Sequence, residues 1–449
     1  MALSIVEAVR RIKAGVAKCL TAESIEKACR ACGHSWRQRE VGPAQTVWTF
    51  LAQVLHGNTA CAHAVRLADL KCSTEAYCQA RARLPLGVYE RLLEQTSRAA
   101  RPSCCLATWH GHRTFLVDGS SFSMPDTPVL QAHFGQSGRQ LAGCGFPLAH
   151  WLTLFDAQSG LLIKQLASPL RTHDMAQVAQ LHPELTADDL LVGDTAFASY
   201  VHLALLRQRN LHGVFRGHQR QLISFRRDRK LVGQLPAGTV AEFATGRLMR
   251  KLGRYDQLVE YTKPLQAPAW MDADSFAALP ERLIVRELRF ATKQKGGRTR
   301  TITLVTTLLD PEEYPAEELA ALYRQRWQIE TYLGQLKTTM GMDVLHCRSV
   351  SGVLKEMTMY ALVYNLVRLV IVEAARRQHT SVRSLSFIDA LRWLAHACWR
   401  LPELRLAINA ARPNRHEPRV KKRRPKKFKL MNQPRCQLRQ QLATKQLGA

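Results

Sequence analysis

The chain has 449 residues, of which 46% are hydrophobic and 22% charged, the composition of an ordinary globular protein with room for two or three domains. Lys and Arg total 64 against 36 Asp and Glu, a formal net charge of +28. A positive field of this size indicates a polyanionic partner and salt-dependent affinity. Residues 412–449 hold 13 Lys or Arg and one acid, a charge of +12, which leaves +16 for the rest. The charge is therefore not confined to a basic tail.

Twelve cysteines are scattered along the chain without regular spacing. With no secretory signal in a chain this long, they are expected to be free thiols in a reducing cytosol. Cys29-x2-Cys32 with His34 resembles half of a zinc site, for which Cys61 and His63 are conceivable partners. No second pair follows at finger-like spacing, so core or surface cysteines are the favoured interpretation.

Residues 1–105 are predicted to be helical, because apolar residues recur at helical spacing at Val6, Val9, Ile12 and Val16. Helical spacing alone supports a bundle. A role in DNA recognition for this region is a hypothesis that comes from the family resemblance given below.

Residues 106–216 change to a strand-rich pattern, with two strands that each deliver an aspartate. The segment 114–122 is predicted to contain a buried strand that ends in Asp118 and Gly119, and the segment 190–197 repeats this design with Asp194. Ligands in open α/β sheets bind outside the carboxyl ends of strands. Taken singly, Asp118 could open a turn and Asp194 could cap the helix predicted near residues 199–209.

The other elements of this region follow from their patterns. Residues 151–155 and 161–166 flank a good hairpin turn at 156–160, so three consecutive antiparallel strands are expected. A helix near 175–181 and a strand at 213–216 complete the region. Three strands followed by alternating helix and strand fit a ribonuclease-H-like core.

Residues 217–307 lie between the second aspartate and the helix described next, and they are predicted to form a β-rich insertion. Strands are expected at 283–290 and 300–305. The cluster of Arg226, Arg227, Arg229 and Lys230 is predicted to contact a polyanion backbone. Trp270 could stack on a flipped base, but packing against the insertion sheet is slightly favoured.

Residues 308–345 return to the core and contain one predicted helix with two distinct faces. At about 100° per residue, Tyr323, Arg326, Glu330 and Lys337 fall within an arc of roughly 60°. A separate apolar stripe consists of Leu322, Ile329, Leu333, Leu336 and Met340. A carboxylate flanked by cations suits a site for metal ions and a phosphate backbone. The alternative is a solvated face on which Arg326 and Glu330 form an ordinary i,i+4 ion pair.

Residues 346–411 are predicted to be helical again. The apolar run 357–372 is interrupted by Asn365 and Arg368 and is too short to span a membrane comfortably, so it is expected to be a buried core helix. The basic residues 412–449 are expected to be poorly ordered and to clamp DNA non-specifically.

Two strand-ending aspartates followed by a helix glutamate are far harder to explain as separate turns and caps than as one site. The spacing Tyr323-x2-Arg326-x3-Glu330-x6-Lys337, together with Asp118-Gly119-Ser120, resembles the Y-R-E-K signature of bacterial insertion-sequence transposases, the DDE enzymes of the insertion-sequence-four type. The likeness runs from about residue 118 to just beyond residue 337. One departure is Thr195-Ala196-Phe197, where the family often shows Arg-Gly-Phe after the second aspartate.

The resemblance implies an α/β fold, namely a ribonuclease-H-like catalytic core with a β-rich insertion, flanked by N- and C-terminal helical regions. Asp118, Asp194 and Glu330 would be the catalytic residues and would bind two Mg²⁺ or Mn²⁺ ions, since all-oxygen sites favour these metals over Zn²⁺. The residues expected to contact DNA are Tyr323, Arg326 and Lys337.

The implied function is DNA transposition by cleaving the ends of an insertion sequence and joining them to target DNA. The expected partner is double-stranded DNA, with a homodimer in the synaptic complex, in the bacterial cytoplasm with the nucleoid and without a membrane. Two alternatives stay open. One is a metal-dependent DNA endonuclease that does not join strands, and the other is a DNA-binding regulator derived from a transposase.

Overall fold

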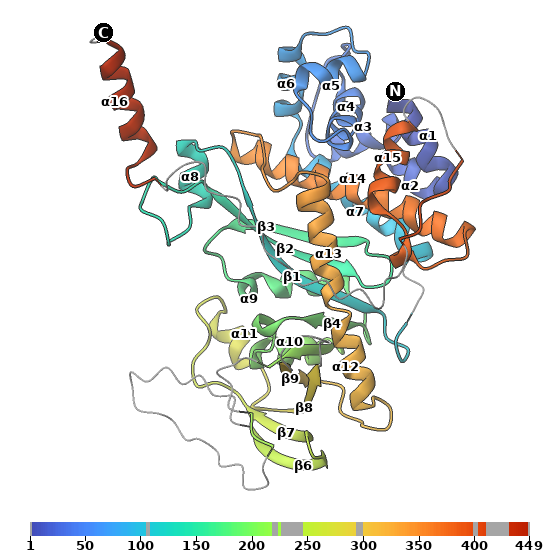
Figure 1. The fold of residues 1–449 in the computed structure, drawn as a ribbon, viewed down its shortest axis with the longest axis vertical. Helices are drawn as coiled ribbons and strands as arrows, with labels where there is room; N and C mark the ends of the chain where they lie inside the picture. The colour runs from blue at the N-terminus through green and yellow to red at the C-terminus, as the bar shows by residue number, and fades with distance from the viewer. Residues whose placement is uncertain are drawn as a thin grey trace.

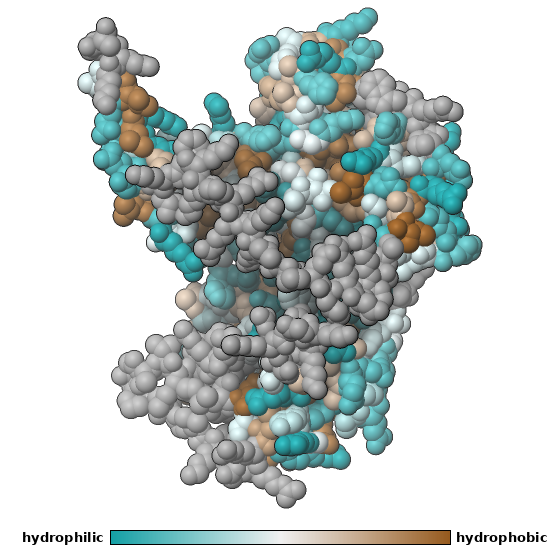
Figure 2. All heavy atoms as spheres, in the orientation of Figure 1, coloured by the Kyte–Doolittle hydropathy of each residue, from teal (hydrophilic) through white to brown (hydrophobic). Residues whose placement is uncertain are grey.

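A computed structural model describes residues 2–104, 108–217, 223–225, 246–292, 300–397, 403–409 and 431–447. At its centre lies one sheet of nine strands in the order β3-β2-β1-β4-β5-β9-β8-β7-β6 (Figure 1). A hydrophobic core continues from the N-terminal helices through this sheet to the C-terminal helices, so these parts pack as one body. Figure 2 shows a mostly hydrophilic exterior with scattered hydrophobic side chains on the face in view.

The first five strands of the chain form one half of the sheet. They are β1 (Thr114–Ser123), β2 (Leu148–Asp156), β3 (Leu162–Pro169), β4 (Leu190–Gly193) and β5 (His212–Arg216). β1, β2 and β3 are antiparallel, whereas β4 is parallel to β1 and β5 is parallel to β4. The predicted hairpin is present, with Gly160 at φ +69° and the buried Asp156 accepting hydrogen bonds from the Ser159 backbone and hydroxyl.

Short helices join these strands. They are α8 (Pro128–Phe134), α9 (Asp174–Gln177), the 3-10 helices η1 (Val178–Glu184) and η2 (Thr195–Phe197), and α10 (Tyr200–Gln208). The helices predicted near residues 175–181 and 199–209 are confirmed. The hydroxyl of Ser199 caps α10 by accepting a hydrogen bond from the His202 backbone.

The strands of the predicted insertion extend the same sheet. They are β6 (Arg247–Gly253), β7 (Asp256–Thr262), β8 (Arg282–Thr292) and β9 (Arg300–Thr306), with α11 (Ala273–Ala277) between β7 and β8. β9 pairs with β5 in the antiparallel sense, so the region is joined to the core strands edge to edge. Trp270 packs against the core, as the favoured alternative predicted. The cluster Arg226, Arg227, Arg229 and Lys230 lies outside the described residues.

Residues 1–105 form helices, as predicted. These are α1 (Ala2–Ile12), α2 (Ala14–Cys19), α3 (Ala22–Ala31), α4 (Pro43–Leu55), α5 (Cys61–Leu67), α6 (Thr74–Arg83) and α7 (Leu86–Cys104). Cys29 is buried in the core beside Cys32, while Cys61 lies near Arg81 and Cys78. Within the described part of the chain, no three His, Cys, Asp or Glu side chains are arranged to hold a metal ion, so the Cys29 pair has no zinc partners there.

The C-terminal half supplies α12 (Ala316–Arg324), α13 (Trp327–Gly334), the π-helix η3 (Gln335–Thr339), α14 (Val350–Arg377), the 3-10 helix η4 (Val382–Ser384), α15 (Phe387–His396) and α16 (Arg435–Leu447). α13 crosses the face of β1 (Figure 1). α14 is long and apolar enough to cross a membrane, but 89% of its most apolar window is buried inside the protein. It is the core helix predicted for 357–372, and it packs against α7, α4, α15 and β3.

The expectation of a poorly ordered tail is wrong for residues 435–447, which form α16. Their helix-compatible composition, with Leu, Gln, Arg and Ala and no Gly or Pro inside the helix, accounts for the difference. Residues 410–430, with most of the basic cluster, lie outside the described residues.

A buried polar contact fastens α14 to the sheet. The Asn365 side chain, 2% exposed, accepts a hydrogen bond from the Leu162 backbone N–H and donates to the Leu162 carbonyl, both at 2.8 Å. Replacement Asn365→Leu removes both contacts and leaves buried backbone groups without this partner. We expect a loss of about 2–4 kcal/mol in the free energy of unfolding, measured by denaturant titration. Exposed Asn432→Leu is the control, and a loss below about 0.5 kcal/mol for Asn365→Leu would contradict the prediction.

Candidate active site

The parallel pairing of β1 with β4 brings the two predicted aspartates together. Leu116 pairs with Val192, so the same register, continued by two residues, sets Asp118 opposite Asp194. Both aspartates lie where the β1–β4 ladder ends. From there β1 continues without β4 and is paired with β2. The sheet therefore supplies two neighbouring carboxylates.

The expected end of the strand at Asp118 is wrong. β1 continues to Ser123, because its antiparallel ladder with β2 runs on after the parallel ladder with β4 has stopped. The Thr153 hydroxyl, across from Asp118, donates a hydrogen bond to the Asp118 carbonyl. Asp118 is thus held inside a strand and not in a turn.

Asp194 does cap the turn that follows it. Its Oδ1 accepts a hydrogen bond of 2.8 Å from the Ala196 backbone N–H, at the start of η2. Ala196 has no positive φ, so the alanine that replaces the family's usual glycine fits this turn without backbone strain. The alternative that Asp194 caps the helix near residues 199–209 is wrong, because Ser199 caps α10. Asp194 caps η2 instead, and this contact is compatible with the site hypothesis because it orients the Asp194 carboxylate.

Burial and neighbouring charge act on Asp118. Desolvation and the nearby Asp194 carboxylate raise the pKa of Asp118 to about 6, and the Arg326 guanidinium opposes this change. The side chain is 20% exposed. Two carboxylates that repel each other in a partly desolvated place form a site that a cation would relieve.

The segment carrying Glu330 is not the single helix that the periodicity predicts. α12 ends at Arg324, α13 begins at Trp327, and the backbone N–H groups of Gln325 and Arg326 bond to carbonyls three residues earlier. Beyond Gly334 the chain widens into the π-helix η3. No Gly or Pro marks the first break. It coincides with the position where Arg326 reaches β1, so a tertiary contact overrides the local helical propensity.

Arg326 connects two of the three predicted carboxylates. Its Nη1 lies 3.7 Å from Asp118 Oδ2, and its Nη2 lies 3.1 Å from Glu330 Oε1. The Arg326 side chain is 13% exposed, whereas that of Glu330 is 44% exposed. The i,i+4 ion pair between Arg326 and Glu330 that the alternative interpretation predicts is present. The same guanidinium also contacts Asp118, so it links Glu330 to β1.

Tyr323 and Lys337 are less open than an exposed helix face would make them. Tyr323 is 5% exposed because α12 packs against β5, so the aromatic residue of the predicted polar face is buried. Its pKa is raised by burial, with Arg326, Arg216 and Asp194 as charged neighbours. Lys337 lies with its Nζ 4.9 Å from the Phe122 ring centroid, and burial lowers its pKa. The predicted apolar stripe is buried in full.

Two residues beside Asp118 were not anticipated from the sequence. His150 Nε2 lies 2.5 Å from Asp174 Oδ1, and this pair packs on the backbone of Gly119. A Cβ at Gly119 would come within 2.7 Å of Asp174 Oδ1 and 2.9 Å of His150 Cε1. A side chain at position 119 would therefore displace the ends of Asp174 and His150, so glycine is favoured here by close approach and not by a turn. His150 comes from β2 and Asp174 from α9, and nothing in their local sequence marks them.

An exposed aromatic also borders the site. Trp327 is 57% exposed at the start of α13, and the Arg326 guanidinium carbon lies 5.8 Å from its ring centroid. Its exposure follows from the break between α12 and α13, which the periodicity did not reveal.

The donor set fits a hard divalent cation in kind. Asp118, Asp194 and Glu330 offer carboxylate oxygens, the ligands that Mg²⁺ and Mn²⁺ prefer. Among the described residues these groups are not closed into a ready three-ligand cluster, because Arg326 lies between Asp118 and Glu330. In this arrangement the Arg326 guanidinium offsets part of the negative charge of Asp118 and Glu330, a charge that bound metal ions would also offset.

Comparison with known proteins identifies a family for this chain. Residues 109–366 match the family described as the transposase DDE domain. The matched residues include Asp118, Asp194 and Glu330. The chain is 24% identical over 421 residues to the transposase InsG for insertion sequence element IS4 of Escherichia coli K12, covering 87% of this chain and 88% of that protein. A solved piggyBac transposase synaptic complex with hairpin DNA matches with a TM-score of 0.48 and 10% identity, over 88% of this chain and 80% of that one.

The raised pKa of Asp118 predicts how the site affects folding. Because the folded pKa of about 6 exceeds the unfolded value of 3.8, the contribution of Asp118 to stability is present below pH 4 and is lost as pH rises through 6. Asp118→Asn should raise the free energy of unfolding by about 2–3 kcal/mol at pH 8 in a metal-free buffer, and by almost nothing at pH 4. Denaturant titrations at both values test this. An equal difference at the two pH values would contradict it.

Proposed function

Because the chain belongs to the family of transposases with a DDE domain, we propose that it is a DNA transposase that cleaves the ends of an insertion sequence and joins them to target DNA by two-metal phosphoryl transfer. Residues 109–366, matched to that family, contain the whole candidate site. The proposal rests on one observation above all. The sheet sets Asp118 opposite Asp194, and Arg326 ties Glu330 to Asp118.

The strand order supports a ribonuclease-H-like core for the proposed enzyme. β1, β2 and β3 form an antiparallel meander, and β4 and β5 are added in parallel on the other side of β1. On this proposal, the core consists of residues 106–216 and 308–345, with 217–307 inserted between them. The helical regions 1–105 and 346–411 would then serve DNA recognition and assembly.

Asp118, Asp194 and Glu330 would hold two Mg²⁺ or Mn²⁺ ions. When bound, such ions activate the attacking oxygen and stabilise the leaving oxygen of an in-line displacement at phosphorus. Arg326 offsets part of the negative charge of Asp118 and Glu330. Its guanidinium would also bind a phosphate of the DNA backbone, for which its planar donors are well suited.

Lys337, next to Phe122 on β1, would bind backbone phosphate as a point charge. Tyr323 is buried beside Arg326, so it would act at the DNA interface by positioning the Arg326 guanidinium. The working complex would contain double-stranded DNA ends, target DNA and a homodimer of the chain, in the bacterial cytoplasm.

The carboxylates provide the first test of this function. Asp118→Asn, Asp194→Asn and Glu330→Gln should each lower end cleavage and strand joining by more than about 100-fold, since even outer partners of metal ligands are worth about 10–100-fold. The assay uses labelled end DNA with a target plasmid and Mg²⁺, and exposed Glu317→Gln is the control. Full cleavage by any of the three variants would overturn the assignment. Cleavage by the native protein without joined products would favour the endonuclease alternative.

The cations provide a second test, made in the Asp118→Asn background so that DNA stays intact. Arg326→Ala and Lys337→Ala should weaken binding to end DNA and flatten the slope of log affinity against log salt by about one unit each. Arg324→Ala, exposed at the end of α12, is the matched control. An unchanged slope would remove the tested residue from the DNA interface.

A further inference from the structure

The helix α16 extends away from the body of the protein and is fastened at one end only (Figure 1). Arg435 Nη1 lies 3.3 Å from Asp126 Oδ2 and donates to the Gly145 carbonyl at 3.1 Å, and its guanidinium carbon lies 4.0 Å from the Phe146 ring centroid. The Arg435 backbone N–H also donates to the Gly143 carbonyl. The attachment site consists of Asp126, just before α8, and of Gly143, Gly145 and Phe146, between α8 and β2.

Beyond this attachment, α16 has almost no support from the protein. Residues 439–444 are all exposed, and Leu442 is 61% exposed. A helix of 13 residues is marginal in water on its own, and one that is polar nearly all round gains little from packing. The remaining surface of α16 is therefore available to a partner that would order it further.

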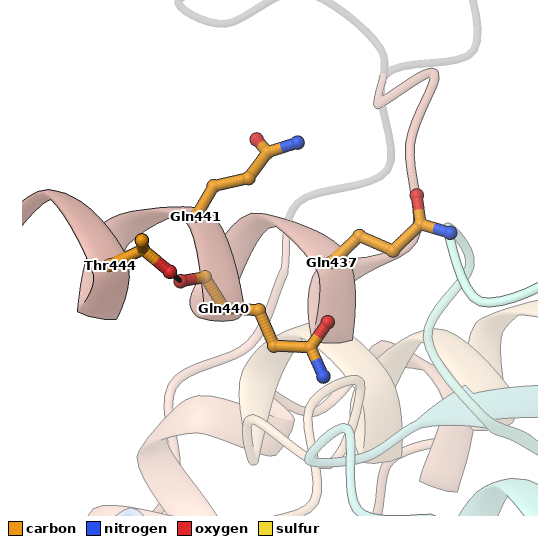
Figure 3. Close-up of a pocket in the computed structure, with 4 residues that line it drawn as sticks. All are labelled: Gln437, Gln440, Gln441 and Thr444. Carbon is orange, nitrogen blue, oxygen red and sulfur yellow. Dashed lines mark hydrogen bonds between the residues drawn. The ribbon is translucent and has the colours of Figure 1, made fainter.

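One face of α16 is rich in amides. Gln437, Gln440, Gln441 and Thr444 lie within an arc of about 100° and line an open depression along the helix (Figure 3). The Thr444 hydroxyl donates to the Gln440 carbonyl at 2.9 Å. The three glutamine side-chain amides have no hydrogen-bond partner within the part of the chain that the structure describes, so their donors and acceptors are free for a ligand.

The charge of α16 is of one sign. The helix contains two arginines and one lysine and no acidic residue. The major groove of B-DNA admits an α-helix, and glutamine can bond an adenine through N6 and N7 together. A cationic helix with a row of amides therefore suits a groove that is bordered by phosphates and exposes base edges.

A second copy of the chain is a less suitable occupant. Leu438 and Leu442, one helical turn apart, form an apolar strip on α16, and Leu442 is 61% exposed. The helix is shorter than two heptads, and a coiled-coil seam is indicated only by three or four. The exposed strip is thus too short to explain the helix by self-association.

We propose that α16 is a base-reading helix that enters the major groove of double-stranded DNA through Gln437, Gln440 and Gln441. The inference rests on the proposed function in that it takes DNA as the substrate, and it adds a sequence-reading element that is separate from the carboxylate site. The attachment through Arg435 would hold this helix at a fixed position relative to β1.

The test compares the base preference of two proteins in full-length form. A pool of randomised double-stranded oligonucleotides is selected on the native chain and on the triple variant Gln437→Ala, Gln440→Ala, Gln441→Ala, and the bound DNA is sequenced. Alanine favours helix, so the variant keeps α16 folded. We expect discrimination at a subset of base positions to fall by roughly 5- to 150-fold per lost bidentate contact, with affinity for random duplex and its salt slope unchanged. Gln433→Ala, outside the helix, is the matched control and should leave the preference unaltered.

Other results would overturn the inference. An unchanged base preference in the triple variant would exclude α16 as a reader. If Leu438→Ser with Leu442→Ser instead converts a dimer to a monomer and leaves base preference intact, α16 is a self-association arm. These results are distinct from a failure of the proposed function, which would appear as native protein that binds DNA and still does not cleave or join it.

Discussion

Parallel pairing of two short strands, β1 and β4, imposes the main electrostatic constraint on this protein. Because Leu116 pairs with Val192, two aspartates follow in the same register at neighbouring positions. Adjacent strands in a sheet lie about 4.8 Å apart, so this register keeps the two like charges near each other. Burial of Asp118 and, after it, the nearby Asp194 carboxylate raise the pKa of Asp118. The fold thus maintains a local excess of negative charge that a less constrained backbone would relieve.

Two features of the surrounding structure act on this pair of aspartates: the Arg326 cation and the close packing of His150 and Asp174 against Gly119. Arg326 reaches Asp118 from the break between α12 and α13 and carries Glu330 with it. On the other side, His150 and Asp174 occupy the space that a Cβ at Gly119 would need. The site is therefore assembled from β1, β2, α9, β4 and α13, and its rigidity comes from the sheet that joins most of them.

The sequence predicted those parts of the site that depend on local pattern. Apolar runs ending in Asp118 and Asp194, the hairpin at Gly160 and the buried stripe beside Glu330 follow from periodicity and turn chemistry, and the structure contains each of them. The break at Gln325, the burial of Tyr323 and the approach of Asp174 to Gly119 depend on contacts between distant segments. No single-helix or single-strand pattern encodes such contacts. The continuation of β1 past Asp118 has the same origin, since it requires β2 as a partner.

The inserted strands show how a distant segment is held relative to the site. β9 pairs with β5, and the buried Arg286 of β8 is ion-paired with Asp256 at 2.6 Å and donates to the Tyr314 carbonyl just before α12. Burying such a pair adds little net stability, because desolvation offsets the attraction. Its geometric effect is larger, since a planar guanidinium fixes two partners at once. The region of β6–β9 is therefore coupled both to the strand beside Asp194 and to the helix that leads to Arg326. A DNA strand that contacted β6–β9 would therefore be positioned relative to Asp194, beside β5, and relative to Arg326 and Glu330, which follow α12.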